Sequence, residues 1–253
     1  ILESLEKRPP LYIRLNPTKV GGQELTDSLT SLDVKVNNIT TIEGAYALEH
    51  SGSIADLTAF QQGWFHVQDL SSQICCFLVG ARPGERVIDV CAAPGGKTFT
   101  LAENMKNEGE ILSFDKYKGK VRLIQQGAER LGLSIVKTGL RDASFPKEPL
   151  EKADCVLCDV PCSGLGIIRK KPDIRYKNPK ELAKLPREQR AILENAASYV
   201  RPGGTLIYST CTVLPEENQE VVTWFLKEHP EFHLSPFVLP APIGGCDGHL
   251  TLW

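Results

Sequence analysis

The sequence has few of the features that mark secreted or membrane proteins. Its 253 residues include only one methionine. They also include eight cysteines, which are too few for a disulfide scaffold in a chain of this length. No apolar run is long enough to cross a membrane, and residues 1–14 carry too many charges for a signal peptide. These absences predict a protein of the cytoplasm with reduced thiols and no membrane partner.

The sequence also lacks an excess of positive charge. Lys and Arg number 29 and Asp and Glu number 31, so the net charge is −2 and general polycation binding of nucleic acid is excluded. One segment differs, because residues 169–190 hold nine basic and three acidic side chains. Three prolines in this segment argue against a long helix. We interpret it as an arm that contacts phosphates, with a solvated surface loop as the alternative. The candidate RNA-binding residues are Arg169, Lys170, Lys171 and Arg175.

The hydrophobic pattern predicts an α/β fold. Short β-branched runs alternate with amphipathic stretches of helical length from Glu85 onward, as in a doubly wound, mostly parallel sheet of Rossmann-like type. The expected strands are 86–90, 110–115, 134–138, 153–159 and 205–210, and the expected helices are 98–107, 117–131, 187–200 and 215–229. We expect a small α+β lead-in over residues 1–80, with a role in RNA binding, and a catalytic domain over residues 81–253.

A tight turn follows the first of these strands and reads Cys91, Ala92, Ala93, Pro94, Gly95, Gly96, Lys97 and Thr98. A phosphate-binding loop of nucleotide triphosphatases would need glycine at position 91, and the adjacent glycines do not fit the dinucleotide pattern Gly-x-Gly-x-x-Gly. The turn therefore favours an adenosyl ligand without a pyrophosphate.

Two acidic residues follow the next strands. Asp115 lies 20 residues beyond Gly95, where a carboxylate accepts hydrogen bonds from the two ribose hydroxyls of such a ligand. Asp142 follows the third strand and could accept from the adenine amino group. A helix cap before Tyr117 is the alternative role for Asp115.

Two cysteines stand at the predicted carboxyl ends of strands, Cys162 in Asp159-Val160-Pro161-Cys162 and Cys211 in Thr210-Cys211-Thr212. Active sites of such sheets lie at these ends. Thiolate addition to carbon 6 of cytosine makes carbon 5 nucleophilic, which is a form of covalent catalysis. Asp159 could then assist at ring nitrogen 3 and bind the exocyclic amine. A second cysteine could serve in the release step.

A metal site is the competing interpretation of the thiols. Cys155, Cys158, Cys162 and Cys246 could form a set of four ligands. However, Cys155 and Cys158 lie an odd number of positions apart in one strand and should point to opposite faces of the sheet. We therefore expect no metal and regard Cys155 and Cys158 as buried, inert thiols, together with Cys75 and Cys76.

The three motifs together resemble the RNA cytosine-C5 methyltransferase family. They are 91–98, 159–164 and 210–212, and they occur in the order typical of that family. Finer details at 67–73, 164–175 and 215–218 look like its bacterial 16S ribosomal RNA methyltransferase B branch. The resemblance implies S-adenosylmethionine (SAM) as cofactor, bound by residues 91–97, Asp115, Asp142 and Asp159. It also implies Cys211 as nucleophile, Cys162 in product release and 16S ribosomal RNA as substrate.

Two departures from this branch and two alternatives remain. Members usually begin with a helical RNA-binding domain and continue past a Leu-Trp pair into a last strand, so we expect the chain to be a piece of a longer product. Its start at Ile1, with Met105 as the sole methionine, agrees with this expectation.

The alternative functions are the same chemistry on transfer RNA and a catalytically silent RNA-binding assembly factor. Intact Asp159, Cys162 and Cys211 argue against the silent factor.

Overall fold

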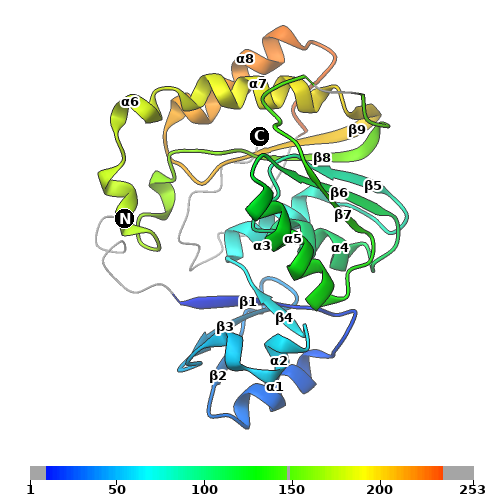
Figure 1. Ribbon diagram of the computed structural model, residues 1–253, viewed down its shortest axis with the longest axis vertical. Coiled ribbons are helices and arrows are strands. Elements are labelled where there is room, and N and C mark those ends of the chain that lie inside the picture. Colours follow the sequence, from blue (N-terminus) through cyan, green and yellow to red (C-terminus); the bar gives the residue numbers. More distant parts are fainter. Residues whose placement is uncertain (1–9, 147–148, 236–253) are drawn as a thin grey trace.

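Two β-sheets organise the chain in the computed structural model, which describes residues 10–146 and 149–235. The smaller sheet is antiparallel and lies at one end of the molecule, and the larger one is parallel and carries helices on both faces (Figure 1). The predicted α/β fold with a doubly wound, Rossmann-like sheet is confirmed. The division at residue 80 stays a prediction, although residues 10–67 supply every strand of the smaller sheet.

The smaller sheet has the strand order β2-β3-β1-β4. Its two central strands are mostly buried, as in β1, where Tyr12, Ile13 and Leu15 are buried and Ile13 is fully so. Its elements are β1 (Leu11–Leu15), α1 (Gly22–Thr30), β2 (Lys35–Asn38), β3 (Ala45–Glu49), a 3₁₀ turn (Ile54–Asp56), α2 (Thr58–Gln61) and β4 (Phe65–Val67). Helix α3 (Leu70–Val79) then leads into the larger sheet.

The larger sheet has the strand order β7-β6-β5-β8-β9, with all neighbours parallel. The chain moves outward from β5 in one direction and from β8 in the other, so the order reverses between these two strands. In open α/β sheets the ligand crevice lies at the carboxyl ends beside such a reversal. The elements are β5 (Arg86–Asp89), α4 (Gly96–Asn104), β6 (Glu110–Asp115), α5 (Lys118–Leu131), β7 (Val136–Leu140), β8 (Ala153–Asp159), α7 (Leu185–Ala197), β9 (Val200–Ser209) and α8 (Gln219–Glu228).

The parallel sheet is buried on both faces, which explains its nearly continuous apolar strands. Helices α3, α4 and α5 cover one face, where Cys155 packs with Leu157 and Ile111. Helices α7 and α8 cover the other face, where Cys158 packs (Figure 1). Cys155 and Cys158 are therefore on opposite sides of the sheet, as their spacing predicted.

Buried polar contacts join the lead-in to the larger sheet. Asn16 donates to the carbonyl oxygens of Gly63 and Leu131, at 3.0 and 2.9 Å. His66 Nδ1 lies 3.3 Å from Glu103 Oε1 on α4, and both side chains are almost fully buried. Since α4 begins at the tight turn after β5, the lead-in contacts the same helix that positions the expected cofactor site.

The predicted boundaries of two helices and one strand were wrong by several residues, and the strand expected at 205–210 begins at Val200 as β9. The helix expected at 187–200 ends at Ala197, because Val200 pairs with Ala153 and begins β9. The helix expected at 215–229 is a 3₁₀ turn (Pro215–Glu217) followed by α8. Asn218 separates the two, since its side chain donates to the carbonyls of Thr212 and Leu214 and does not continue the helix.

The basic segment 169–190 is more helical than predicted. It contains a 3₁₀ turn (Pro172–Tyr176), the short helix α6 (Pro179–Leu182) and the first part of α7. Each proline stands in the first turn of its element, where a missing N–H costs nothing. Among the described residues no helix is both long and apolar enough to span a bilayer.

Candidate active site

The turn between β5 and α4 is shaped by glycine. Gly95 has a φ of +112°, and a side chain there would bring a Cβ within 2.4 Å of the Phe99 ring. The amide of Ala92 donates to the Phe114 carbonyl of the neighbouring strand at 2.8 Å. Position 95 therefore needs a residue without a Cβ, which lets the turn pack closely on Phe99.

Two predicted carboxylates lie beyond the ends of the neighbouring strands. Asp115 ends β6, and its Oδ1 accepts the Tyr117 amide at 2.9 Å, which is a local turn and not the helix cap considered as its alternative role, since α5 has no side-chain cap. Its Oδ2 is 3.8 Å from Lys120 Nζ. Asp142 follows β7 and accepts the Ser144 amide at 2.9 Å. Asp115 has an oxygen outside the turn bond, and its place beside the glycine turn fits the ribose of SAM.

Asp159, at the end of β8, lies in a charged contact that the sequence did not reveal. Its Oδ2 is 2.6 Å from Lys97 Nζ, and its Oδ1 accepts the Ser209 hydroxyl at 3.0 Å. Burial alone would lower the pKa of Lys97, but the Asp159 carboxylate outweighs burial and holds that pKa above its ordinary range. The pair therefore brings a fixed ammonium and a fixed carboxylate to the carboxyl end of the sheet.

The two predicted catalytic cysteines are brought together. Cys162 follows β8 and Cys211 follows β9, and their sulfurs lie 3.1 Å apart. The Cys211 amide donates to the Cys162 sulfur at 3.3 Å, and both side chains are half-buried. Hydrogen bonding from Cys162 lowers the pKa of Cys211, and the same contact together with burial raises the pKa of Cys162. These opposite shifts favour Cys211 as the thiol that ionises first.

A buried network behind the cysteines was missed in the sequence. Glu217 accepts the Ser163 amide at 2.9 Å and the Gln189 amide group at 2.8 Å through one oxygen. The Ser163 and Thr212 hydroxyls lie 2.6 Å apart. Because Ser163 and Thr212 each follow a cysteine, these bonds fix the two cysteine loops together. A glutamate two residues after a proline reads as an ordinary first-turn residue, so no sequence signal marked Glu217 as buried.

The basic segment begins beside these loops. Lys177 Nζ donates to the Ser163 carbonyl at 2.8 Å. Lys171 and Arg175 are exposed, whereas Arg169 and Lys170 are half-buried, and Lys170 contacts Asp69. Of the four predicted RNA contacts, Lys171 and Arg175 are thus the most accessible to a phosphate.

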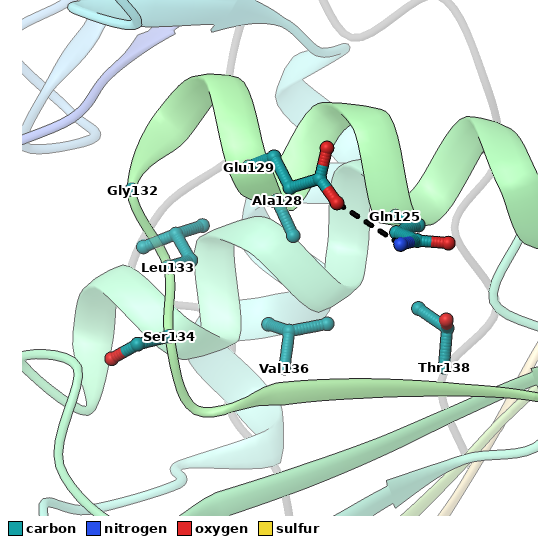
Figure 2. Close-up of a pocket in the computed structure, with 8 residues that line it drawn as sticks. All are labelled: Gln125, Ala128, Glu129, Gly132, Leu133, Ser134, Val136 and Thr138. Atoms are coloured by element: carbon teal, nitrogen blue, oxygen red, sulfur yellow. Dashed lines mark hydrogen bonds between the residues drawn. The ribbon is translucent and has the colours of Figure 1, made fainter.

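Two hollows lie away from this cluster. One, of about 640 Å³, opens between α5 and the edge strand β7, and Figure 2 shows Val136 and Thr138 of that strand facing Gln125 and Ala128 of the helix. The other, of about 980 Å³, lies over the lead-in sheet and reaches Asp69 and Lys170. Neither is lined by a predicted catalytic residue. The candidate site lies instead at the carboxyl ends of the parallel strands, where the reactive side chains meet.

The described residues contain no group of His, Cys, Asp and Glu side chains placed to hold a metal ion. Cys155 and Cys158 are buried, and burial raises the pKa of the Cys155 thiol to about 12. Cys75 and Cys76 are buried as well, as expected. Cys246, the fourth ligand considered, lies outside the described residues.

Known proteins are similar to this chain in sequence over most of its length. The family of 16S rRNA methyltransferases RsmB/F matches residues 77–247, which is more than half of the chain. The chain belongs to the RsmB/F family. The probable ribosomal RNA small subunit methyltransferase B of Bacillus subtilis is 42% identical over 227 residues, covering 88% of this chain and 51% of that protein. Its counterpart from a Synechocystis species is 37% identical, covering 94% and 54%.

A solved structure is similar to this chain in fold and in sequence. The methyltransferase homolog protein from Pyrococcus horikoshii superimposes with a TM-score of 0.79 at 31% identity, covering 90% of this chain and 72% of that one. The family confirms the predicted methyltransferase class and SAM as cofactor. The chain spans about half the length of the curated RsmB/F relatives that it matches.

Replacing Gly95 with alanine should weaken SAM binding at least about tenfold, because a Cβ at a φ of +112° would collide with Phe99 and displace the turn. Isothermal titration with SAM measures this. Gly119→Ala is the matched control, since a Cβ at that position in α5 meets no atom within 4 Å. Equal SAM affinities for the two variants would show that the turn does not hold the cofactor.

A second prediction concerns Asp89, which is buried where β5 ends. Burial raises the pKa of Asp89 to about 7, although Thr98 donates to it at 2.8 Å. The folded state thus holds this proton more tightly than the unfolded chain, so the free energy of unfolding falls as pH rises from about 4 to about 7. Asp89→Asn removes this fall, which is on the order of 3 to 4 kcal/mol. Urea unfolding at several pH values tests it, and parallel curves for the two proteins would contradict it.

Proposed function

We propose that this chain transfers a methyl group from SAM to carbon 5 of a cytosine in small-subunit ribosomal RNA, through a covalent adduct between Cys211 and carbon 6. The observation that carries the proposal is the pair of thiols 3.1 Å apart at the ends of β8 and β9, close to Asp159. Membership of the RsmB/F family supports the RNA substrate. Such a substrate would place the reaction in the cytoplasm.

Cys211 has the chemical character that the first step needs. Thiolate addition at carbon 6 requires an ionised sulfur, and the lowered pKa of Cys211 favours that form. The addition pushes electron density onto ring nitrogen 3, where a proton or a hydrogen bond has to neutralise it. The Lys97 ammonium can supply that proton or hydrogen bond, and its partner, the Asp159 carboxylate, can accept from the exocyclic amine of the base.

The later steps need an electrophile and a base. SAM supplies the electrophilic methyl group that carbon 5 takes up. A base then removes the proton from carbon 5, and the bond between carbon 6 and the Cys211 sulfur breaks. The Cys162 sulfur lies 3.1 Å from the sulfur that must leave, so it is suited to assist this release. Residues 91–97, Asp115 and Asp142 are the proposed cofactor contacts.

The basic segment is the proposed hold on the RNA backbone. An enzyme that modifies a base must take it out of its stack, and contacts to phosphates keep the strand in place meanwhile. Arg169, Lys170, Lys171 and Arg175 begin a few residues after Cys162 on the chain. The lead-in at residues 1–80 is proposed to share in this binding.

Replacing Lys171 and Arg175 with glutamine should lower RNA affinity about tenfold and make the salt dependence shallower by about 1.5 in the logarithmic slope. Fluorescence anisotropy with labelled RNA over a salt series measures both quantities. The matched control replaces Lys106 and Lys227, which are equally exposed but lie before β6 and on α8. A control variant as weak as the test variant would point to net charge, and would remove the basic segment from the proposal.

Transfer of labelled methyl from SAM to protein-free small-subunit ribosomal RNA and to bulk transfer RNA tests the function. Label at carbon 5 of a cytosine in ribosomal RNA is the expected result. Label in transfer RNA alone would keep the chemistry and replace the substrate. Absence of label despite SAM binding would favour the silent RNA-binding factor.

A further inference from the structure

We propose that Cys162 and Cys211 form a reversible disulfide when the protein meets a peroxide, and that this bond switches off methyl transfer. The two sulfurs lie 3.1 Å apart, whereas the sulfurs of a disulfide lie about 2.05 Å apart. The two sulfurs therefore have to move about 1 Å closer for the dithiol to become a disulfide. Loss of activity rests on the proposed function, but formation of the bond rests only on the two thiols.

The surrounding bonds keep the two thiols side by side. Strands β8 and β9 pair in register up to Asp159 and Ser209, so the cysteine loops leave the sheet together. The Gly166 amide donates to the Cys211 carbonyl at 3.0 Å. Together with the Ser163–Thr212 contact, this bond holds the two cysteine loops next to each other.

The two thiols also differ in pKa, as a reaction with one attacking thiolate and one second thiol requires. Thiolates attack peroxides, and the lowered pKa of Cys211 makes it the first thiol to react. Cys162 keeps its proton more tightly and acts second. Four other thiols, at Cys75, Cys76, Cys155 and Cys158, are buried and have raised pKa values, so they should react far more slowly.

The chemistry uses hydrogen peroxide as the oxidant. The Cys211 thiolate attacks one peroxide oxygen, the O–O bond breaks, and the leaving hydroxide takes a proton to become water. Cys211 is then a sulfenic acid. The Cys162 sulfur loses its proton and attacks the Cys211 sulfur, and the sulfenic hydroxyl leaves as a second water. Two thiols have lost two electrons to the peroxide, and a dithiol reductant reverses the change.

The experiment follows the thiols themselves. The full chain is exposed to hydrogen peroxide with dimedone present, alkylated with N-ethylmaleimide, digested and analysed by mass spectrometry. We expect the Cys162 peptide joined to the Cys211 peptide, about 2 Da lighter than their sum, and no such species after dithiothreitol. Methyl transfer should fall at least about tenfold with peroxide and return with dithiothreitol.

Variants separate the two cysteines. Cys162→Ser should give no cross-link and a dimedone adduct on Cys211, because the sulfenic acid then lacks its partner. Cys155→Ala is the control, since its thiol is on the buried α3 side of β8, and it should cross-link like the original chain. Thermal unfolding confirms that each variant is folded.

Three results would overturn the proposal: a dimedone adduct on Cys211 of the unmodified chain without a cross-link, a cross-link to Cys91, or no reaction of either sulfur. The mass readout does not depend on methylation. A cross-link in a chain that methylates no RNA would therefore keep the disulfide and reject the proposed function.

Discussion

Cys211→Ala should abolish methyl transfer, with kcat lowered about 10⁴-fold or more, because alanine cannot form the bond to carbon 6 that makes carbon 5 nucleophilic. The variant should still bind SAM, since Cys211 follows β9 while the glycine turn follows β5. Single-turnover transfer of labelled methyl to RNA, with SAM titration beside it, measures both quantities.

Cys158→Ala is the matched control for that variant. It removes a thiol from β8, the strand next to β9, but this thiol is fully buried against α7 and α8. We expect its rate to stay within about threefold of the original chain, with a modest loss of stability from the small cavity. An active Cys211→Ala variant would reject Cys211 as the nucleophile. An inactive Cys158→Ala variant would show that loss of a nearby thiol abolishes activity by disturbing the fold.

Whereas Cys211→Ala should form no covalent adduct, Cys162→Ala should accumulate a covalent protein–RNA complex. If Cys162 assists release, its loss leaves the adduct on Cys211 formed but slow to break. A denaturing gel with labelled RNA and SAM should show a shifted band that is at least about tenfold stronger than with the original chain.

The double variant Cys162→Ala, Cys211→Ala is the control, because it lacks the sulfur that forms the adduct. It should give no shifted band. A band that persists in the double variant would place the covalent bond on another residue. A Cys162→Ala variant that turns over at the original rate would remove Cys162 from the release step and leave it a structural partner 3.1 Å from Cys211.

The sequence predicted those parts of the fold that depend on local pattern. Strand runs such as 110–115 and 153–159 agree with β6 and β8 because continuous apolar runs are typical of a parallel sheet buried on both faces. The two cysteines could be placed together because each ends a strand, and parallel strands end at the same edge. No local pattern could show that β8 and β9 are neighbours.

The misses have a common cause in contacts between distant residues. Lys97 and Asp159 are 62 positions apart, and only the strand order β5-β8 brings them within 2.6 Å. Glu217 looked like a helix-start residue, yet it is buried as the acceptor for Ser163 and Gln189. Asn218 is a local exception, because its side chain bonds to Thr210 and Thr212, eight and six positions away, and interrupts a predicted helix.

The measurement that tests the central claim most directly uses small-subunit ribosomal RNA made with 5-fluorocytidine. Fluorine at carbon 5 cannot leave as a proton does, so an enzyme that adds a thiolate at carbon 6 and methylates carbon 5 should stay bound. We predict a SAM-dependent adduct whose peptide maps to Cys211. An adduct on Cys162, or methylation of the unsubstituted RNA with no adduct on the fluorinated one, would contradict the mechanism.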